Sequence, residues 1–202
     1  LQAFNYILKQ DVKSNIWLEA FYWRTLIYIN LQQYELAKSS LEKELENNKI
    51  SKRNLSLLYD SMSELHYKKG DYAALIKSLK KAVKHSSSQE QIRRSYFIIA
   101  QSFMNLNKND SASVYFQKSI DTKANNFSDI YLDANLKLSL LKKQELDEDY
   151  FNRMLRQPRN LMASSKINYY YALNSYYKGN YNNSEIQLKK SLKLINDDKN
   201  LK

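Results

Sequence analysis

Cysteine is absent from this 202-residue chain, and proline and glycine are nearly so, with one and two residues. The lack of cysteine excludes disulfide bonds, thiolate catalysis and cysteine-ligated zinc. The scarcity of proline and glycine leaves little from which to build the tight turns of an all-β fold. No apolar run approaches the ~18 residues that suggest a membrane span. These absences favour an all-helical protein.

Positive charge is in excess: Lys and Arg number 32 against 21 Asp and Glu, a formal charge of +11. Such a balance favours acidic partners, nucleic acid or an anionic surface, although a solvated repeat surface can be equally basic. The missing cysteines do not distinguish cytoplasm from periplasm. No signal peptide opens the sequence, so we expect a fragment of a longer protein whose targeting segment lies elsewhere.

A repeated pattern emerges when the chain is aligned on itself. Four copies start with a small residue, at Thr25, Ser63, Ala100 and Ala172, and the starts are 38, 37 and 72 residues apart. The last spacing leaves room for one divergent copy. A period slightly above ~34 residues is typical of tetratricopeptide hairpins with longer helices or linkers. The pattern therefore predicts an all-α fold, a tetratricopeptide-like right-handed superhelical solenoid of helix-turn-helix repeats.

The expected organisation is a single solenoid over residues 1–202. An orphan helix at 1–10 precedes repeats at about 15–48, 53–86, 90–122, 127–157 and 164–196, and residues 196–202 resemble a polar linker. In the divergent copy, helices are expected near 128–143 and 146–156. Pro158 should stop the second of these, because proline lacks an amide donor and biases the preceding residue away from helical dihedrals.

The template assigns roles to its positions. Because a bulky side chain would force two helices apart, the four small starting residues should lie where the helices of a hairpin approach most closely. A second small position starts the second helix, with a leucine as the exception, and a large apolar position follows about one turn later. The residues at these two positions are Ala37, Leu75, Ala112 and Ser184, then Leu41, Leu79, Phe116 and Leu188.

Reactive groups are few. His66 and His85 have no Cys or His partner at metal-binding spacing, so packing or interaction with a helix C-terminus explains them better than catalysis. The acidic run Asp147, Glu148 and Asp149 falls at a predicted helix start, where negative charge favours the helix dipole. No phosphate-binding glycine loop is present. We therefore expect no enzymatic activity, no catalytic or metal-binding residue and no cofactor.

Lysines recur late in the second helix of two copies. This position is the outer, solvated face of a tetratricopeptide hairpin, and nucleic-acid binding would instead favour basic residues interleaved with exposed aromatic rings along one groove. Most of the 17 tyrosines fall at packing positions, so we expect no nucleic acid among the partners. The lysines are Lys80, Lys81, Lys84, Lys189, Lys190 and Lys193.

The first helices of the copies line the concave face of such a stack. That face is aromatic and mixed in charge, which suits a peptide or a partner helix, and Arg94 could meet a carboxylate. We expect docking to centre on Tyr67, Arg94, Phe97 and Gln101, although packing between repeats is the alternative for any one residue. The candidate partner-binding residues are Tyr22, Tyr67, Arg94, Phe97, Gln101, Met104, Tyr169 and Tyr176, with Leu26, Ile29, Asp60, Glu64 and Leu173 on the same face. The Lys and Asn pattern of a carboxylate clamp is not evident.

Three stretches follow one another in a particular order: IWLEAFYWRTLIYINLQQYELAKSSLEKE from Ile16, RSYFIIAQSFMNLNKNDSASVYFQKSI from Arg94 with IYLDANLKLSL from Ile130, and LRQPRN from Leu155 leading into NYYYALNSYYKGNYNNSEIQLKKSL. This order of copies resembles the tetratricopeptide lipoprotein of the Bacteroidota type IX secretion and gliding-motility machinery. It implies a periplasmic scaffold, anchored to the outer membrane only through a lipidated cysteine outside this chain. Its partners would be other components of the secretion machinery.

Two alternative functions remain open. The repeats could be the sensing region of a signalling or transcription regulator, with a cytoplasmic location, and a fused kinase or DNA-binding module in the full-length gene would identify it. They could also form a basic nucleic-acid-binding repeat protein. Salt-dependent binding to random oligonucleotides would distinguish that function from protein binding.

Overall fold

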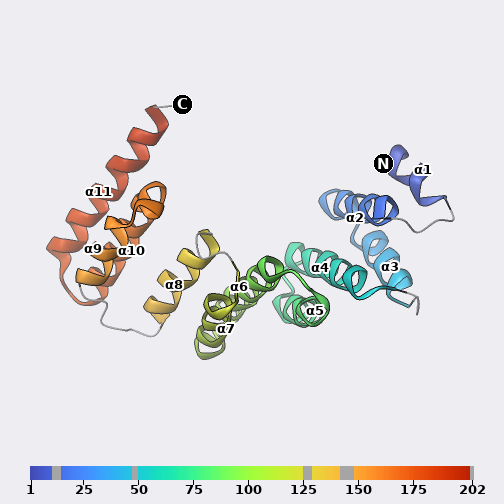
Figure 1. The fold of residues 1–202 in the computed structure, drawn as a ribbon, viewed down its shortest axis with the longest axis horizontal. Coiled ribbons are helices and arrows are strands. Elements are labelled where there is room, and N and C mark those ends of the chain that lie inside the picture. Colours follow the sequence, from blue (N-terminus) through green and yellow to red (C-terminus); the bar gives the residue numbers. More distant parts are fainter. Residues whose placement is uncertain (11–14, 47–49, 125–128, 142–147, 201–202) are drawn as a thin grey trace. The chain divides into compact units, whose positions relative to one another are not determined.

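The computed structural model describes residues 1–10, 15–46, 50–124, 129–141 and 148–200. All regular structure in these ranges is helical, which confirms the predicted all-α class. The chain divides into two compact units, Leu1–Asn125 and Asn126–Lys202, coloured blue to yellow-green and yellow to red in Figure 1. The elements of unit 1 are α1 (Gln2–Leu8), α2 (Asn15–Asn30), α3 (Tyr34–Leu45), α4 (Lys52–Lys68), α5 (Tyr72–His85), α6 (Gln89–Asn105) and α7 (Asn109–Asp121). Those of unit 2 are α8 (Asp129–Leu141), α9 (Glu148–Arg156), the 3₁₀ helix η1 (Pro158–Ala163), α10 (Ser164–Tyr177) and α11 (Tyr181–Asn200).

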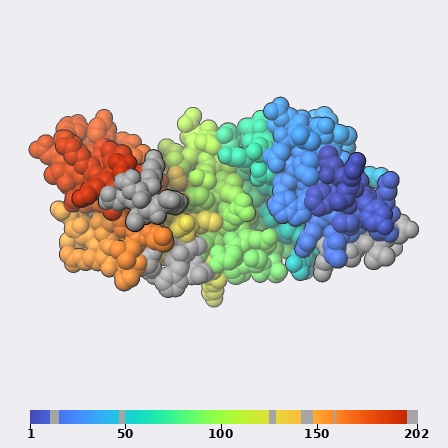
Figure 2. Space-filling view, turned by 90° about the horizontal axis from the view of Figure 1, so that it is seen from above, coloured from blue at the N-terminus to red at the C-terminus, as the bar shows by residue number. Residues whose placement is uncertain are grey.

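Unit 1 is a row of helix pairs. The pairs α2/α3, α4/α5 and α6/α7 occupy the predicted repeats at 15–48, 53–86 and 90–122, and α1 packs against α2. Each pair also contacts the next, through α4 on α2 and α3 and through α6 on α5. On the face drawn in Figure 2, the side chains of these neighbouring helices meet in a continuous surface. Among the helices that the structure describes, none combines the length and apolar character needed to cross a membrane.

The same turn joins the two helices in four hairpins. A residue with positive φ follows the first helix at Gln32, Gly70, Asn107 and Gly179, with φ of 59°, 71°, 56° and 76°. The next amide donates back to a carbonyl of the first helix, as from Asp71 N to His66 O at 2.9 Å. Left-handed backbone favours glycine and tolerates asparagine, so the sequence suits this turn at three of its four sites. These sites are 38, 37 and 72 residues apart, the spacing of the sequence repeat.

A hydrogen bond across the hairpin recurs at the same spacing. Ser56 Oγ donates to Ala82 O at 3.1 Å and Ser191 Oγ to Ser165 O at 2.8 Å, which joins the start of a first helix to the end of its second. In α6/α7 the bond runs from Ser119 Oγ to Arg93 O at 3.1 Å. The hairpins therefore share geometry at both ends, although their sequences differ.

Arg93 is fully buried and ties the end of α7 to α6. Its Nε donates to Ser119 O at 3.1 Å and its Nη2 to Thr122 O at 2.6 Å and Ala124 O at 3.2 Å. The last carbonyls of a helix lack partners within the helix and carry partial negative charge, so a guanidinium there satisfies both needs. Arg93 therefore acts as a structural cap.

The small residues expected at the closest helix contacts are all buried, Ala100 completely. Leu41, Leu79 and Phe116 are buried as expected, but the prediction for Leu188 is wrong, since 39% of its surface is exposed. Its neighbour Gln187 turns inward instead and donates to Asn183 Oδ1 at 3.1 Å. Within the described residues, no neighbouring helix covers the apolar template position on α11.

Unit 2 departs from a plain row of hairpins. No Cα of α8 lies within 8 Å of one in α9, and both helices instead meet α10. The described residues form one core, in which the Phe151 ring stacks on Tyr171 at 4.6 Å between centroids and Leu136 and Ile167 are buried. α9 ends two residues before Pro158, as proline requires. α11 continues to Asn200, so the prediction of a polar linker from residue 196 is wrong as far as the described residues extend.

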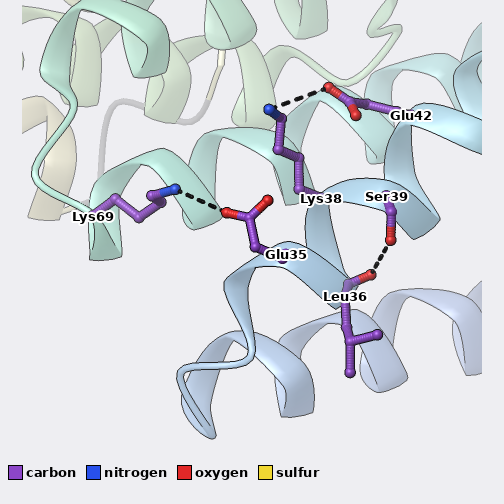
Figure 3. A network of polar contacts seen from close by, with 6 residues as sticks. All are labelled: Glu35, Leu36, Lys38, Ser39, Glu42 and Lys69. Carbon is purple, nitrogen blue, oxygen red and sulfur yellow. Dashed lines mark hydrogen bonds and ion pairs between the residues drawn. The ribbon is translucent and has the colours of Figure 1, made fainter.

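Between α3 and α4, exposed charged groups add little to the packing (Figure 3). Lys69 Nζ lies 3.5 Å from Glu35 Oε1, and Lys38 lies 3.8 Å from Glu42 within α3. Exposed ion pairs contribute about 0–1 kcal/mol each, so the buried apolar residues beneath them, such as Leu41 and Leu65, hold the helices together.

Candidate functional site

The eight candidate partner-binding residues fall in both units, and each unit is described by itself. In unit 1, Tyr22 lies on α2 and Tyr67 on α4. Four others, Arg94, Phe97, Gln101 and Met104, lie on α6. In unit 2, Tyr169 and Tyr176 lie on α10, both about half exposed.

A pocket of about 130 Å³ opens in unit 1 between the first helices of successive hairpins. No Cα of α4 comes within 8 Å of one in α6, so a gap separates these two helices. Side chains from α2, α4, α5 and α6 line it. They are Tyr22, Leu57, Asp60, Ser63, Glu64, Leu79, Gln91, Arg94, Ser95 and Ile98.

Asp60 is the most perturbed charged group of this pocket. Burial raises the pKa of its carboxyl from 3.8 to about 6, and the positive charge of Arg94 opposes that rise. Among the described residues, no hydrogen-bond donor or cation within ion-pair distance meets this carboxyl, since Arg94 acts on it only at longer range. A largely buried carboxylate without a direct partner is unstable relative to one in water.

Three further ionisable groups line the pocket with Asp60: Tyr22, Glu64 and Arg94. Glu64 lies one turn further along α4, and Arg94 lies on α6. Burial raises the pKa of the Tyr22 hydroxyl, Arg94 lowers it, and the two carboxylates raise it. The pocket thus combines two acids, one base and one phenol from three helices.

The pocket is lined by a residue at which one repeat departs from the pattern of the others. Asp60 occupies the repeat position that is aromatic in the other recognised copies, at Tyr22, Phe97 and Tyr169. In α6/α7 that position is Phe97, whose ring contacts Phe116 with 5.6 Å between centroids. In α4/α5 the matching pair is Asp60 and Leu79, which are smaller and both line the pocket.

The same comparison corrects the role predicted for Phe97. Only 9% of its surface is exposed, and its ring packs against Phe116 within its own hairpin. The prediction that Phe97 is an accessible anchor is therefore wrong. Ile29, expected on the same face, is also buried.

Other predicted residues are accessible. Tyr67 exposes 54% of its surface and Arg94 is exposed, whereas Gln101 and Met104 are half-buried. Tyr67 lies three residues after Glu64 on α4, which places it one turn from the pocket. The sequence had placed Asp60 and Glu64 on this face but had not singled them out, and the signal that marks Asp60 is its departure from an aromatic repeat position.

The lysines late in α5 are exposed, as expected, but some also contact aromatic rings. Lys80 Nζ lies 5.4 Å from the Tyr115 ring centroid, and Lys81 Nζ lies 5.1 Å from that of Tyr59. On α7, Lys118 Nζ lies 4.8 Å from Tyr115. Such cation–π contacts contribute about 0.5–1 kcal/mol at exposed sites. Lys80 therefore helps join successive hairpins, whereas Lys81 and Lys118 contact rings of their own hairpin.

The two histidines lie in structural settings. His85 is the last residue of α5 and stacks on Tyr59 at 6.0 Å between centroids. His66 is half-buried, and burial lowers the pKa of its imidazole, with smaller contributions from Asp71, which raises it, and from two lysines, which lower it.

α9 begins at Glu148 with Asp149 in its first turn, and Asp147 lies outside the described residues. In the described part of the chain, no group of three His, Cys, Asp or Glu residues could hold a metal ion.

Paired helices with a common turn and a common cross-hairpin hydrogen bond define a helical-repeat protein. Residues 18–49 and 94–126 match the family model described as tetratricopeptide repeat, so these two segments are similar to tetratricopeptide repeats. A TPR repeat-containing protein of Methanocaldococcus jannaschii is 27% identical over 186 residues, which cover 90% of this chain. The chain spans 31% of the length of that relative.

Two solved structures share the fold. The TPR protein YrrB, described as having an unusual peptide-binding site, has a TM-score of 0.63 and 16% identity, with 95% of this chain and 92% of that one covered. The apo form of the quorum sensor NprR from B. thuringiensis has a TM-score of 0.60 and 18% identity, with 96% of this chain and 60% of that one covered. At these identities the likeness concerns the fold alone.

Proposed function

We propose that this chain is a non-catalytic scaffold that binds a partner protein, as an extended segment, on the α2–α4–α6 surface of unit 1. The observation that carries the proposal is the pocket between α4 and α6, with exposed Tyr67 and Arg94 beside it. Ligand sites are generally concave, with a few polar groups that fix orientation. The peptide-binding site of the structural neighbour YrrB supports the same class of ligand.

The helical setting favours binding of this kind. The side chains of Tyr22, Asp60 and Arg94 lie on α2, α4 and α6, and each of these helices is anchored by its own buried core residues. The three side chains are therefore positioned before a ligand binds. Ordering loops or side chains on binding costs free energy, and a surface built on rigid helices avoids much of that cost. Tyr67 adds a large contact area with few rotatable bonds, which is typical of residues that dominate binding energy.

The test is capture of a pool of random dodecapeptides, acetylated and amidated at their ends, on the immobilised chain. We expect Tyr67→Ala to weaken retention by roughly 1–2 kcal/mol, the range of an interface hot spot. Lys84→Ala is the matched control, since Lys84 is also exposed but lies late in α5. If the wild type retains no peptide, or if Lys81 and Lys84 variants abolish retention while Tyr67→Ala leaves it intact, this surface is not the binding surface.

A finer proposal is that the full-length protein is a periplasmic component of the type IX secretion and gliding machinery, anchored to the outer membrane as a lipoprotein. Its support is the order of the copies and the segment 155–160. That segment is a built feature of unit 2, since Asn160 is buried and its Nδ2 donates to Met154 O at 2.9 Å. A lipoprotein signal with its cysteine upstream, together with co-purification with secretion components, would support this role. A fused kinase upstream would contradict it.

The second candidate function is the sensing region of a signalling or transcription regulator. The fold likeness to the quorum sensor NprR, over 96% of this chain, favours it. Both candidates use the same peptide-binding surface, so a DNA-binding or kinase module in the full-length gene would separate them.

A further inference from the structure

We propose that the pocket between α4 and α6 receives the positively charged side chain of a lysine or arginine of the bound partner, with Asp60 and Glu64 as its counter-ions. This inference rests on the proposed function and adds to it the chemistry of the ligand. It is carried by the cavity, the arrangement of charges around it and the lack of a direct partner for Asp60.

The size of the cavity suits one side chain. Its volume of about 130 Å³ is well below the ~300–1,000 Å³ of pockets that enclose a whole small-molecule ligand. A helix or a folded domain is too large to enter. The partner therefore lies across the surface and inserts a single side chain.

The walls suit a long side chain with an apolar stem. Leu57 on α4, Leu79 on α5 and Ile98 on α6 line the cavity together with the polar groups. Lysine and arginine bury their methylene groups along apolar surface while they direct the charged end toward a polar one. Asp60 and Glu64, one turn apart on α4, provide that polar end.

The charges favour a cation over an anion. Asp60 is largely buried and has no direct partner in the described part of the chain, so an arriving ammonium or guanidinium would supply a charge-assisted bond to a partly desolvated carboxylate. Arg94 is exposed, and an anion bound to it would compete with water and with two nearby carboxylates. The positive charge of Arg94 thus acts on Asp60 from a distance and weakens the binding of a cation in the pocket.

The experiment uses three pools of random heptapeptides, acetylated and amidated, that differ only in the central residue: lysine, norleucine or glutamate. Norleucine has the aliphatic chain of lysine without its charge. We expect the wild type to retain the lysine pool about tenfold more than the norleucine pool, which corresponds to the loss of one charged contact. Asp60→Asn should abolish that preference, and Arg94→Gln should increase it.

Two further variants serve as controls. Asp110→Asn removes an exposed carboxyl at the start of α7 and should leave the lysine preference unchanged. Glu64→Gln should reduce it, and it keeps the test decisive if Asp60→Asn does not fold, as judged by circular dichroism.

The outcomes separate this inference from the proposed function. Equal retention of all three pools would preserve the binding surface and overturn the lysine pocket, as would an undiminished lysine preference in Asp60→Asn and Glu64→Gln. Preference for the glutamate pool, lost in Arg94→Gln, would identify Arg94 as the binding group and overturn the inference. Retention of no pool would overturn both.

Discussion

Asp60 should destabilise the folded chain at neutral pH, and Asp60→Asn should therefore raise its stability. Burial raises the pKa of Asp60 from 3.8 to about 6, with Arg94 opposing the rise. When the pKa of a carboxyl is higher in the folded state than in the unfolded state, its contribution to stability is complete at pH values below the unfolded-state pKa. That contribution is lost as the pH rises through the folded-state pKa. The loss should therefore develop between about pH 4 and pH 6.5.

The size of this effect follows from the shift. About 2 pKa units at ~1.4 kcal/mol each correspond to at most about 3 kcal/mol. Because Asp60 retains some exposure, we expect about 1–2 kcal/mol, or roughly 2–8 °C in melting temperature for a chain of this size. Asn keeps the shape of the side chain and removes the charge, so the whole difference should appear at pH 7.5 and vanish near pH 4.

The assay is a pair of thermal melts at pH 7.5 and pH 4, followed by circular dichroism. Asp110→Asn is the matched control, because a carboxylate in the first turn of α7 favours the helix dipole and its removal should lower stability slightly. Burial also lowers the pKa of His66, but this residue is present in every variant, so its contribution should cancel in the differences. If Asp60→Asn melts at or below the wild type at pH 7.5, or if its advantage persists unchanged at pH 4, the carboxylate is not desolvated as described.

Three substitutions test the fold. Gln32→Gly should raise stability by roughly 1 kcal/mol, because Gln32 has a φ of 59° that glycine adopts freely, whereas Gln33→Gly, at a φ of −80°, should not. Arg93→Met should cost about 2–4 kcal/mol in urea denaturation, since three carbonyls lose their donor, and an unchanged midpoint would contradict its role as a cap. Ala100→Leu should cost about 1–3 kcal/mol, because Ala100 is fully buried and overpacking strains the helix contact. A variant that melts with the wild type would show that Ala100 is not at a close contact.

The repeat pattern could be predicted from the sequence because it depends on backbone geometry. A residue with positive φ is expensive for most side chains, so glycine recurs at positions 70 and 179 and asparagine stands at 107. A small residue such as Ala100 is required wherever two helices cross closely. Both constraints act on single positions at a fixed spacing, and alignment of the chain on itself detects them.

Burial of individual side chains was harder to predict, because it depends on the neighbouring helix as well as on the repeat position. Leu41 and Leu188 occupy the same position, yet only Leu41 is covered, by the packing of α3 with α2 and α4. In unit 2, the backbones of α8 and α9 likewise remain apart, and both helices contact α10. Phe151 on α9 stacks on Tyr171 of α10.

The candidate site shows the same dependence most clearly at Phe97 and Asp60. Both residues occupy the same repeat position, so the sequence pattern places both on the concave face of the first helix. From the pattern alone, Phe97 is expected to bind a partner more strongly, because it is aromatic. The structure reverses the order, since Phe97 finds an aromatic partner in Phe116 and becomes core, whereas Asp60 stands opposite Leu79 and borders a pocket. The charged pocket thus lies where one repeat has an aspartate at the position that is a core aromatic residue in the next hairpin, and the neighbouring hairpins supply the remaining stability.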